Sequence, residues 1–323
     1  MRVLVTGAGG FVGRALCPTL AAAGHVVVAG LRRVIMPRDR KLPGAAVIRP
    51  IGDLAGSDPL EAAVADVDAV VHLAARAHVM DETESDPVAA YRRVNVDGTR
   101  RLAESAARAG VRRFILLSSV KVNGEHTAVQ AFTEDDAPAP QDAYGITKWE
   151  AEETVASIAR GTAMTAISLR PPLVYGPGAR ANFLALLQAC DSPWPLPLGG
   201  VTGNRRSLIY LANLTDAIRA ALDHPSPPPG AYLLSDGEDL STAALAGRLR
   251  AALGRPRRLL PVPPALLGIA LRATGRRAMA DRLLGSLAVD PERFMGALRW
   301  RPPHSVDSGL AATAAWYREN VRE

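Results

Sequence analysis

Two residues four positions apart, Tyr144 and Lys148, are the part of this chain best suited to acid–base chemistry. Side chains at that spacing lie on one face of an α-helix. A free phenol has a pKa of about 10 and is a poor base at neutral pH. Because an adjacent ammonium stabilises the phenolate, we expect Lys148 to lower the pKa of Tyr144 and to make it a proton-transfer group.

A hydroxyl group completes this constellation. Ser119 follows an apolar segment, Arg113–Leu117, that is typical of a buried strand, and at its end the hydroxyl is placed to hydrogen-bond a reacting oxygen. A tyrosine four residues before a lysine is common by chance, so the pair gains weight only together with the serine and a cofactor site. The three residues predict oxidation or reduction of a hydroxyl or ketone.

A glycine-rich turn near the amino terminus predicts that cofactor site. Gly7, Gly10 and Gly13 follow an apolar segment, Arg2–Thr6, and open a segment with helical periodicity. Glycines let the backbone turn tightly and approach a pyrophosphate, which then rests on the N–H groups at the start of the helix. The position at a first strand–helix junction is the context that a dinucleotide motif requires. The other residues expected beside the dinucleotide are Phe11, Val12, Asp53, Leu54, Leu73, Ala74 and Ala75.

The end of the second predicted strand, His25–Ala29, indicates which dinucleotide binds. An acid there would hold the 2′-hydroxyl of NAD, whereas this strand is followed by Gly30-Leu31 and then by Arg32 and Arg33. Two guanidiniums without a carboxylate suit a 2′-phosphate. We therefore expect NADP(H) in preference to NAD(H). The alternative is that the two arginines belong to a solvated basic loop.

Strand-like and helix-like segments alternate over the first 170 residues. Short apolar runs bounded by glycine, proline or charge are typical of buried parallel strands. The alternation predicts an α/β fold, a doubly wound parallel sheet of the Rossmann type over residues 1–170. Beyond Arg170 prolines cluster and strands become sparse, so residues 171–323 are expected to form a smaller, mostly helical substrate lobe, with room for some segments to return to the sheet. The expected strands are Arg2–Thr6, His25–Ala29, Ala45–Arg49, Ala69–Leu73, Arg113–Leu117 and Ala163–Leu169, and the expected helices are Phe11–Ala23, Pro87–Ala109 and Asp142–Arg160.

Composition and charge exclude several other classes of protein. The net charge of +6 is dispersed in short arginine pairs and only 5% of residues are aromatic, so nucleic-acid binding is not expected. No apolar run reaches the roughly 18 residues of a membrane span, and the amino terminus does not resemble a signal peptide. Cys17 and Cys190 have no spacing typical of a disulfide framework or a zinc site. We expect a cytoplasmic protein without a metal ion.

In this order the motifs resemble the extended short-chain dehydrogenase/reductase superfamily, the group of NAD-dependent epimerases and dehydratases, over essentially the whole chain. The resemblance implies that Ser119 and Tyr144 hydrogen-bond the substrate oxygen, and that Lys148 orients both the nicotinamide ribose and the tyrosine. It also places Asn95 near the cofactor. The motifs that carry it are the glycine turn, His72–Ala75, Asn95–Thr99, Ser119, the Tyr144/Lys148 pair and Arg170–Pro177.

The resemblance further implies a substrate and an assembly. Asn182 and Arg206 match positions that hold the diphosphate of a nucleotide sugar, so a UDP-sugar is the expected partner. Relatives pair the helices expected here at Pro87–Ala109 and Asp142–Arg160 into a homodimer. Both segments carry apolar residues at helical spacing, so we expect a homodimer in this case as well.

Within the superfamily, three functions remain after one is set aside. Dehydratases carry an Asp-Glu pair directly after the serine or threonine, and Val120 and Lys121 occupy those positions here, which argues against water elimination. Segments such as Leu117–Glu125 and Pro171–Leu187 look like a bacterial subgroup that reduces UDP-4-keto-6-deoxy-N-acetylglucosamine to UDP-N-acetylquinovosamine for surface polysaccharides. We therefore expect a 4-keto reductase. The alternatives are a UDP-hexose 4-epimerase acting on UDP-glucose or UDP-N-acetylglucosamine, and a non-catalytic dinucleotide-binding sensor.

Overall fold

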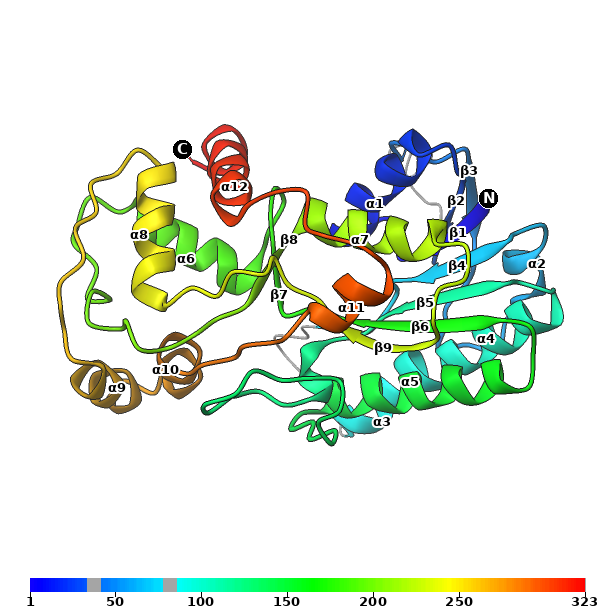
Figure 1. The fold of residues 1–323 in the computed structure, drawn as a ribbon, viewed down its shortest axis with the longest axis horizontal. Coiled ribbons are helices and arrows are strands. Elements are labelled where there is room, and N and C mark those ends of the chain that lie inside the picture. Colours follow the sequence, from blue (N-terminus) through cyan, green and yellow to red (C-terminus); the bar gives the residue numbers. More distant parts are fainter. Residues whose placement is uncertain (34–41, 78–85, 323) are drawn as a thin grey trace.

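A parallel sheet of seven strands forms the centre of the computed structural model, which describes residues 1–33, 42–77 and 86–322. The strand order is β3-β2-β1-β4-β5-β6-β9, and helices cover both faces (Figure 1). Because the order runs outward from β1 in both directions, the sheet has a switch point between β1 and β4, and in open α/β sheets ligands bind in the crevice beyond the carboxyl ends of the strands at such a point. The strands are β1 (Arg2–Thr6), β2 (Val26–Leu31), β3 (Val47–Pro50), β4 (Ala69–His72), β5 (Arg113–Leu117), β6 (Thr165–Arg170) and β9 (Gly230–Leu233).

Alternating side chains along the strands build a core on each face of the sheet. In β1, Val3 and Val5 pack with α1 (Phe11–Ala22) and α7 (Leu211–Asp223), whereas Leu4 faces the opposite side. That opposite face is covered by α4 (Gly98–Arg108) and α5 (Ala143–Arg160), as Figure 1 shows. Burial on both faces explains why the predicted strands are apolar throughout and do not alternate with polar residues.

The predicted α/β fold is confirmed, and the structure adds two features to it. All six predicted strands are present, with ends that differ by at most two residues from the expected ones, and β9 pairs in parallel with β6 at the edge of the sheet. The helix expected over Pro87–Ala109 is divided into α3 (Pro87–Arg92), a π-helical turn (Arg93–Asp97) and α4. Turns of this kind often occur at functional sites.

The carboxyl-terminal region is mostly helical, as expected. Its apolar core surrounds Tyr175, which is fully buried and donates a hydrogen bond to Asp236 Oδ2 at 2.9 Å. Among the residues that the structure describes, no helix combines the length and the apolar character needed to cross a membrane. The remaining elements are α2 (Glu61–Val64), β7 (Leu173–Tyr175), α6 (Ala181–Asp191), β8 (Leu208–Tyr210), α8 (Thr242–Ala252), α9 (Pro264–Ala273), α10 (Arg277–Leu284), α11 (Glu292–Ala297) and α12 (Val306–Asn320).

Candidate active site

The glycine turn at the end of β1 has a backbone that only glycine allows. Gly7 has a left-handed φ of +68°, and a Cβ on it would lie 2.8 Å from the backbone nitrogen of Ala74. A Cβ on Gly13 would lie 2.4 Å from the carbonyl oxygen of Gly7. Gly10, Phe11 and Val12 start α1, and no described side chain caps the first N–H groups of that helix. Uncapped N–H groups beside a closely packed backbone fit the pyrophosphate of a dinucleotide.

Replacing Gly13 by alanine is expected to weaken dinucleotide binding by tenfold or more and to lower the melting temperature. The added Cβ would force α1 away from the Gly7 carbonyl, an overpacking that typically costs about 1–3 kcal/mol. Gly9→Ala is the matched control, because its Cβ would meet only the Leu31 side chain at 3.4 Å. Calorimetric titration of NAD into both variants checks the prediction. Equal affinities would show that the turn does not bind the dinucleotide.

Asn95 holds the segment that follows β4, which includes Leu73, Ala74 and Ala75, against α5. Its Oδ1 accepts a hydrogen bond from the backbone nitrogen of Arg76 at 2.8 Å. Its Nδ2 donates to the Arg76 carbonyl and to Thr147 Oγ1, both at 3.1 Å. The side chain is 1% exposed and lies in the π-helical turn. Asn95 therefore fixes one wall of the crevice to the residue that precedes Lys148.

A buried histidine ties the two central strands to α4. The ring of His72 is hydrogen-bonded to Thr6 Oγ1 at 2.6 Å and to Thr99 Oγ1 at 2.9 Å. Burial, with a smaller contribution from the Lys148 ammonium, lowers the pKa of His72 to about 3, so the imidazole is neutral. Within residues 1–33, 42–77 and 86–322 there is no group of histidine, cysteine or acidic side chains that could hold a metal ion. His72 is thus a structural residue of the crevice.

The expected catalytic residues lie on two adjoining turns. Tyr144 is half-buried in the first turn of α5, and Lys148, one turn further along, is 2% exposed. Ser119 begins a short 3-10 turn, where its hydroxyl accepts a hydrogen bond from the backbone nitrogen of Lys121 at 3.2 Å. A Cβ on Gly145 would lie 2.8 Å from the carbonyl oxygen of Lys121, so the serine turn packs directly on the start of α5.

An ion pair joins the same two turns. Lys121 Nζ lies 2.5 Å from Asp142 Oδ2 and 2.9 Å from Glu125 Oε1. Asp142 also caps α5, because its Oδ1 accepts a hydrogen bond from the backbone nitrogen of Gly145 at 2.7 Å. Lys121 occupies a position where dehydratases carry an acid. Here it connects the turn of Ser119 to the helix of Tyr144.

The pKa of Tyr144 differs from the sequence-based expectation. Burial raises it to about 12, with smaller contributions from the negative charge of Asp142 and from Tyr91, whose ring lies edge-on at 6.5 Å. The predicted lowering of this pKa by Lys148 is wrong for the protein by itself, because removal of the phenol from water and the negative charge of Asp142 both raise it. Tyr144 is therefore a neutral phenol at physiological pH and is ready to donate a proton.

The charge of Lys148 depends on a buried ion pair. Burial lowers the pKa of Lys148 to about 8, and the carboxylate of Glu152, one helical turn further along, opposes this shift. Glu152 is held by Arg170, whose Nη2 lies 2.6 Å from Glu152 Oε2 and whose Nη1 donates to Asn123 Oδ1 at 3.0 Å. All three partners are at least 95% buried. The network keeps a negative charge fixed beside the lysine.

Dinucleotide binding is expected to weaken as the pH rises through about 8. The depressed pKa means that Lys148 loses its proton in that range, and a neutral amine binds ribose hydroxyls less strongly than an ammonium. In the protein without cofactor Tyr144 stays protonated over the same range. A phenolate formed beside bound NAD would strengthen binding as the pH rises, so Tyr144 cannot cause the weakening. Titrations of NAD from about pH 6 to about pH 10 check this. Lys148→Arg, which stays charged, should remove the dependence, and an unchanged affinity for the wild-type protein would contradict the assignment.

The residues expected at the sugar diphosphate lie in the carboxyl-terminal region. Asn182 is exposed near the start of α6, and its Oδ1 accepts a hydrogen bond from Arg282 Nη1. Arg206 donates from Nη1 to the Gly285 carbonyl at 3.2 Å. Burial lowers the pKa of Arg206, and the charge of Arg282 lowers it further. Two guanidiniums that disfavour each other's charge suit an anion with two phosphates. Arg282 was not among the residues expected from the sequence, because only the fold brings residue 282 to residues 182 and 206.

The residues expected around the adenosine are at the surface or in the core. Arg32 and Arg33 are exposed directly after β2. Asp53 is also exposed, and its Oδ1 accepts a hydrogen bond from the backbone nitrogen of Ala55 at 3.0 Å. Leu54 is 5% exposed and belongs to the core under α4. Arg32 and Arg33 are therefore accessible to a ligand at the end of β2.

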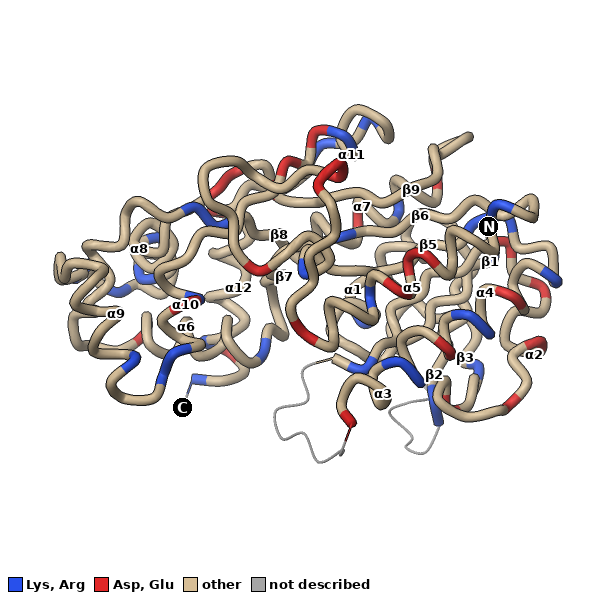
Figure 2. The backbone as a smooth tube through the Cα atoms, turned by 90° about the horizontal axis from the view of Figure 1, so that it is seen from below, with Lys and Arg blue, Asp and Glu red and all other residues tan. Residues whose placement is uncertain are grey.

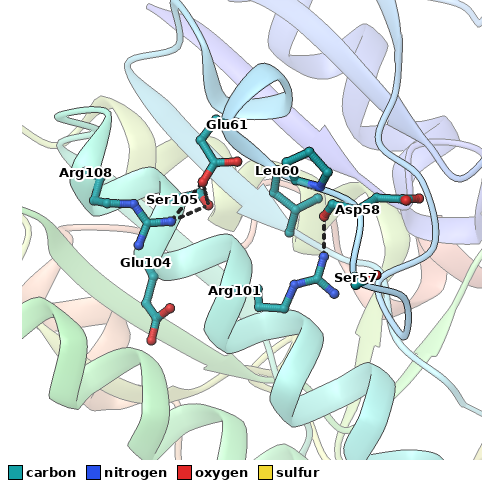
Figure 3. Close-up of a pocket in the computed structure, with 9 residues that line it drawn as sticks. Ser57, Asp58, Leu60, Glu61, Arg101, Glu104, Ser105 and Arg108 are labelled. Atoms are coloured by element: carbon teal, nitrogen blue, oxygen red, sulfur yellow. Dashed lines mark hydrogen bonds and ion pairs between the residues drawn. The ribbon is translucent and has the colours of Figure 1, made fainter.

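A separate pocket of 210 Å³ lies on the outer surface of α4 (Figure 3) and contains none of the expected site residues. Its arginines are paired within the protein: Arg108 Nη2 lies 3.0 Å from Glu61 Oε1, and Arg101 Nη2 donates to the Asp58 carbonyl at 2.5 Å. With its charges paired in this way, the pocket is a surface notch, and the candidate site remains the crevice at β1 and β4.

The relationship to known proteins extends over most or all of the chain. Residues 3–234 match the model of the NAD dependent epimerase/dehydratase family. The chain belongs to this family. A member with a full-length match is the UDP-glucose 4-epimerase of Vibrio cholerae, 40% identical over 322 residues, which cover 99% of this chain and 97% of that protein.

Solved structures of family relatives share the whole fold. MoeE5, solved in complex with UDP-glucuronic acid and NAD, is 26% identical with a TM-score of 0.75 over 99% of this chain and 100% of its own. The UDP-glucuronic acid 4-epimerase of Bacillus cereus, in complex with NAD, is 22% identical with a TM-score of 0.78 over all of both chains. The chain is thus an NAD-dependent enzyme of the epimerase/dehydratase family.

Proposed function

We propose that this chain is a UDP-hexose 4-epimerase that works with NAD(H) and interconverts UDP-glucose or UDP-N-acetylglucosamine with its 4-epimer. This proposal replaces the 4-keto reductase as the favoured function. The full-length similarity to a UDP-glucose 4-epimerase supports it. The structural observation that carries it is the placement of Tyr144 and Lys148 on one face of α5, with the turn of Ser119 against the start of that helix.

Each residue of the site would have its own role in the reaction. Ser119 and Tyr144 would hydrogen-bond the oxygen on carbon 4, and Tyr144 would exchange a proton with it as the sugar passes through a ketone. Lys148 would hold the nicotinamide ribose, and the glycine turn would hold the pyrophosphate. A bound nicotinamide would supply the acceptor for the hydride of carbon 4 and, when oxidised, a positive charge that favours the phenolate. Arg206 and Arg282, with Asn182, would hold the UDP diphosphate while the 4-keto sugar rotates to present its other face to the cofactor.

Loss of water from the sugar is not part of the proposed reaction, and the reason lies in Val120 and Lys121. A valine cannot exchange protons, and the Lys121 ammonium is engaged by Asp142 and Glu125, which raise its pKa against the effect of burial. Neither residue can supply the acid and base that loss of water needs. An epimerase returns the hydride to the same carbon and requires no further acid–base pair.

The proposed cofactor is NAD(H), and the sequence-based preference for NADP(H) is set aside. MoeE5, the relative at 26% identity, was solved with NAD. Arg32 and Arg33 are the observation that still favours NADP(H), and with it the second candidate function, the 4-keto reductase, because a reductase exchanges its cofactor in each turnover. The pair Arg32→Ala/Arg33→Ala separates these cases: it should leave NAD affinity within about twofold, whereas an NADP-dependent enzyme would lose NADPH affinity.

One assay distinguishes the candidates. The purified protein is incubated with UDP-glucose or UDP-N-acetylglucosamine and NAD, and separately with UDP-4-keto-6-deoxy-N-acetylglucosamine and NADPH or NADH. We expect formation of the 4-epimer without net reduction of NAD. Consumption of NADPH or NADH in proportion to the ketone, with no epimer formed, would establish the reductase. Dinucleotide binding without turnover of any of these sugars would favour the sensor.

A further inference from the structure

The helices α9 and α10 form a hairpin at the end of the molecule farthest from the sheet (Figure 1), and α9 is apolar on two faces. Its inner face, with Leu267, Gly268 and Leu271, packs on the protein, and a Cβ on Gly268 would lie 3.1 Å from Leu284 Cδ1 of α10. Its outer face remains exposed. The inner face accounts for two of the four large apolar side chains of the helix, Leu267 and Leu271.

The exposed face of α9 is a regular stripe. Leu266 and Ile269 are 58% and 64% exposed, and Ala270 and Ala273 continue the series at the spacing of one helix face. Two further large apolar side chains lie near it in the sequence, Leu260 before α9 and Met279 in α10, at 47% and 43% exposed. Large exposed apolar patches of this kind usually mark an interaction site.

The same segment carries the charge of the protein. Residues 255–285 contain seven arginines and one acid, Asp281, so their net charge of +6 equals that of the whole chain. Five of these arginines are exposed, two before α9 and three from its last turn to the start of α10: Arg257, Arg258, Arg272, Arg276 and Arg277. Figure 2 shows blue segments, which are lysines and arginines, at the end of the molecule that contains α9 and α10. The rest of the protein therefore has no net charge. The net positive charge lies in the segment that also carries the exposed apolar face.

We propose that the α9–α10 hairpin docks on the surface of a membrane with anionic lipids. An apolar helix face flanked by arginines is the arrangement that inserts into the boundary between headgroups and acyl chains, while the guanidiniums bind lipid phosphates. With ten residues, α9 has about half the length of a bilayer-spanning helix, so it lies in the plane of the surface. The partner is identified by its chemistry, since an anionic nucleic acid offers no apolar phase to Leu266 and Ile269.

Co-sedimentation of the full-length protein with vesicles tests this proposal. We expect binding to vesicles of equal parts phosphatidylglycerol and phosphatidylcholine, at least about tenfold weaker binding to phosphatidylcholine alone, and weaker binding at high salt. Leu266→Glu/Ile269→Glu and Arg276→Glu/Arg277→Glu should each reduce binding to the anionic vesicles by about tenfold or more. Val26→Glu, which changes a 42% exposed apolar residue far from the hairpin, should leave binding unchanged. Circular dichroism confirms that each variant is folded.

Three results would overturn the proposal. Equal binding to both kinds of vesicle, or binding unaffected by the two hairpin variants, would show that this face is not the docking surface. Conversion of a dimer to a monomer by Leu266→Glu/Ile269→Glu in light scattering, without vesicle binding by the wild type, would assign the face to a second copy of the chain. Binding of a fluorescent DNA duplex in place of vesicles would show that the arginines alone determine the partner. None of these results depends on the sugar that the crevice accepts.

Discussion

Tyr144→Phe is expected to lower the rate of sugar interconversion by about 10²–10⁴-fold while NAD affinity stays within about twofold. Its phenol is the group proposed to exchange a proton with the sugar oxygen. As the phenolate that a bound oxidised nicotinamide would favour, it accepts the proton of the carbon 4 hydroxyl, and as the neutral phenol, whose pKa burial raises to about 12 in the protein without cofactor, it returns a proton to the ketone. Phenylalanine keeps the ring and its edge-on contact with Tyr91. The loss therefore reports the missing hydroxyl and not a rearranged helix.

Two companion variants make this result specific. Lys148→Met should reduce both rate and NAD affinity, because the ammonium serves the ribose and the phenol together. Ser119→Ala should reduce the rate less than either, since the serine orients the oxygen without moving its proton. Single-turnover measurements at saturating cofactor give the rank order. A Tyr144→Phe protein with nearly wild-type turnover would place the active site elsewhere.

Arg170→Met is expected to destabilise the protein by about 3–5 kcal/mol, the usual cost of leaving one partner of a buried ion pair alone. Glu152 is 5% exposed and would lose its bidentate partner, and Asn123 would lose a hydrogen bond at 3.0 Å. Urea unfolding measures the change. The double variant Arg170→Met/Glu152→Met should recover part of the loss, because it leaves no unpaired charge in the core.

Arg108→Met provides the matched control for this prediction. It removes an arginine from the pair with Glu61, in which the side chains are 61% and 60% exposed. Exposed pairs contribute little to stability because water screens both charges, so this variant should unfold at nearly the wild-type urea concentration. If Arg170→Met behaves like Arg108→Met, the buried network does not stabilise the fold.

The sequence predicted the parts of this protein that depend on local patterns. Strands buried on both faces are apolar runs, and the glycine turn needs a backbone that few other residues allow, so both could be located within one or two residues. The Tyr144/Lys148 pair follows from helical spacing, considered together with Ser119 and the glycine turn. These features depend on residues that are close together in the sequence, so one amino-acid sequence is enough to locate them.

The features that the sequence could not predict depend on contacts between distant residues. Arg282 meets Asn182 across 100 positions, and β9 reaches the edge of the sheet from beyond the last predicted strand. The pKa of Tyr144 was predicted in the wrong direction, because the tertiary structure buries the phenol and places the negative charge of Asp142 near it. Two residues of the family motifs have structural roles. Arg170 pairs with Glu152, and Tyr175 donates a hydrogen bond to Asp236.

The fate of the hydrogen on carbon 4 of the sugar tests the proposed function most directly. UDP-glucose labelled with deuterium at carbon 4 is incubated with the protein, NAD and an excess of unlabelled NADH, and the 4-epimer is analysed by mass spectrometry and NMR. We predict that the epimer keeps its deuterium at carbon 4 and that Tyr144→Phe forms almost none of it. Deuterium lost to water or to the unlabelled NADH pool, or no epimer at all, would contradict an epimerase that returns the hydride within one crevice.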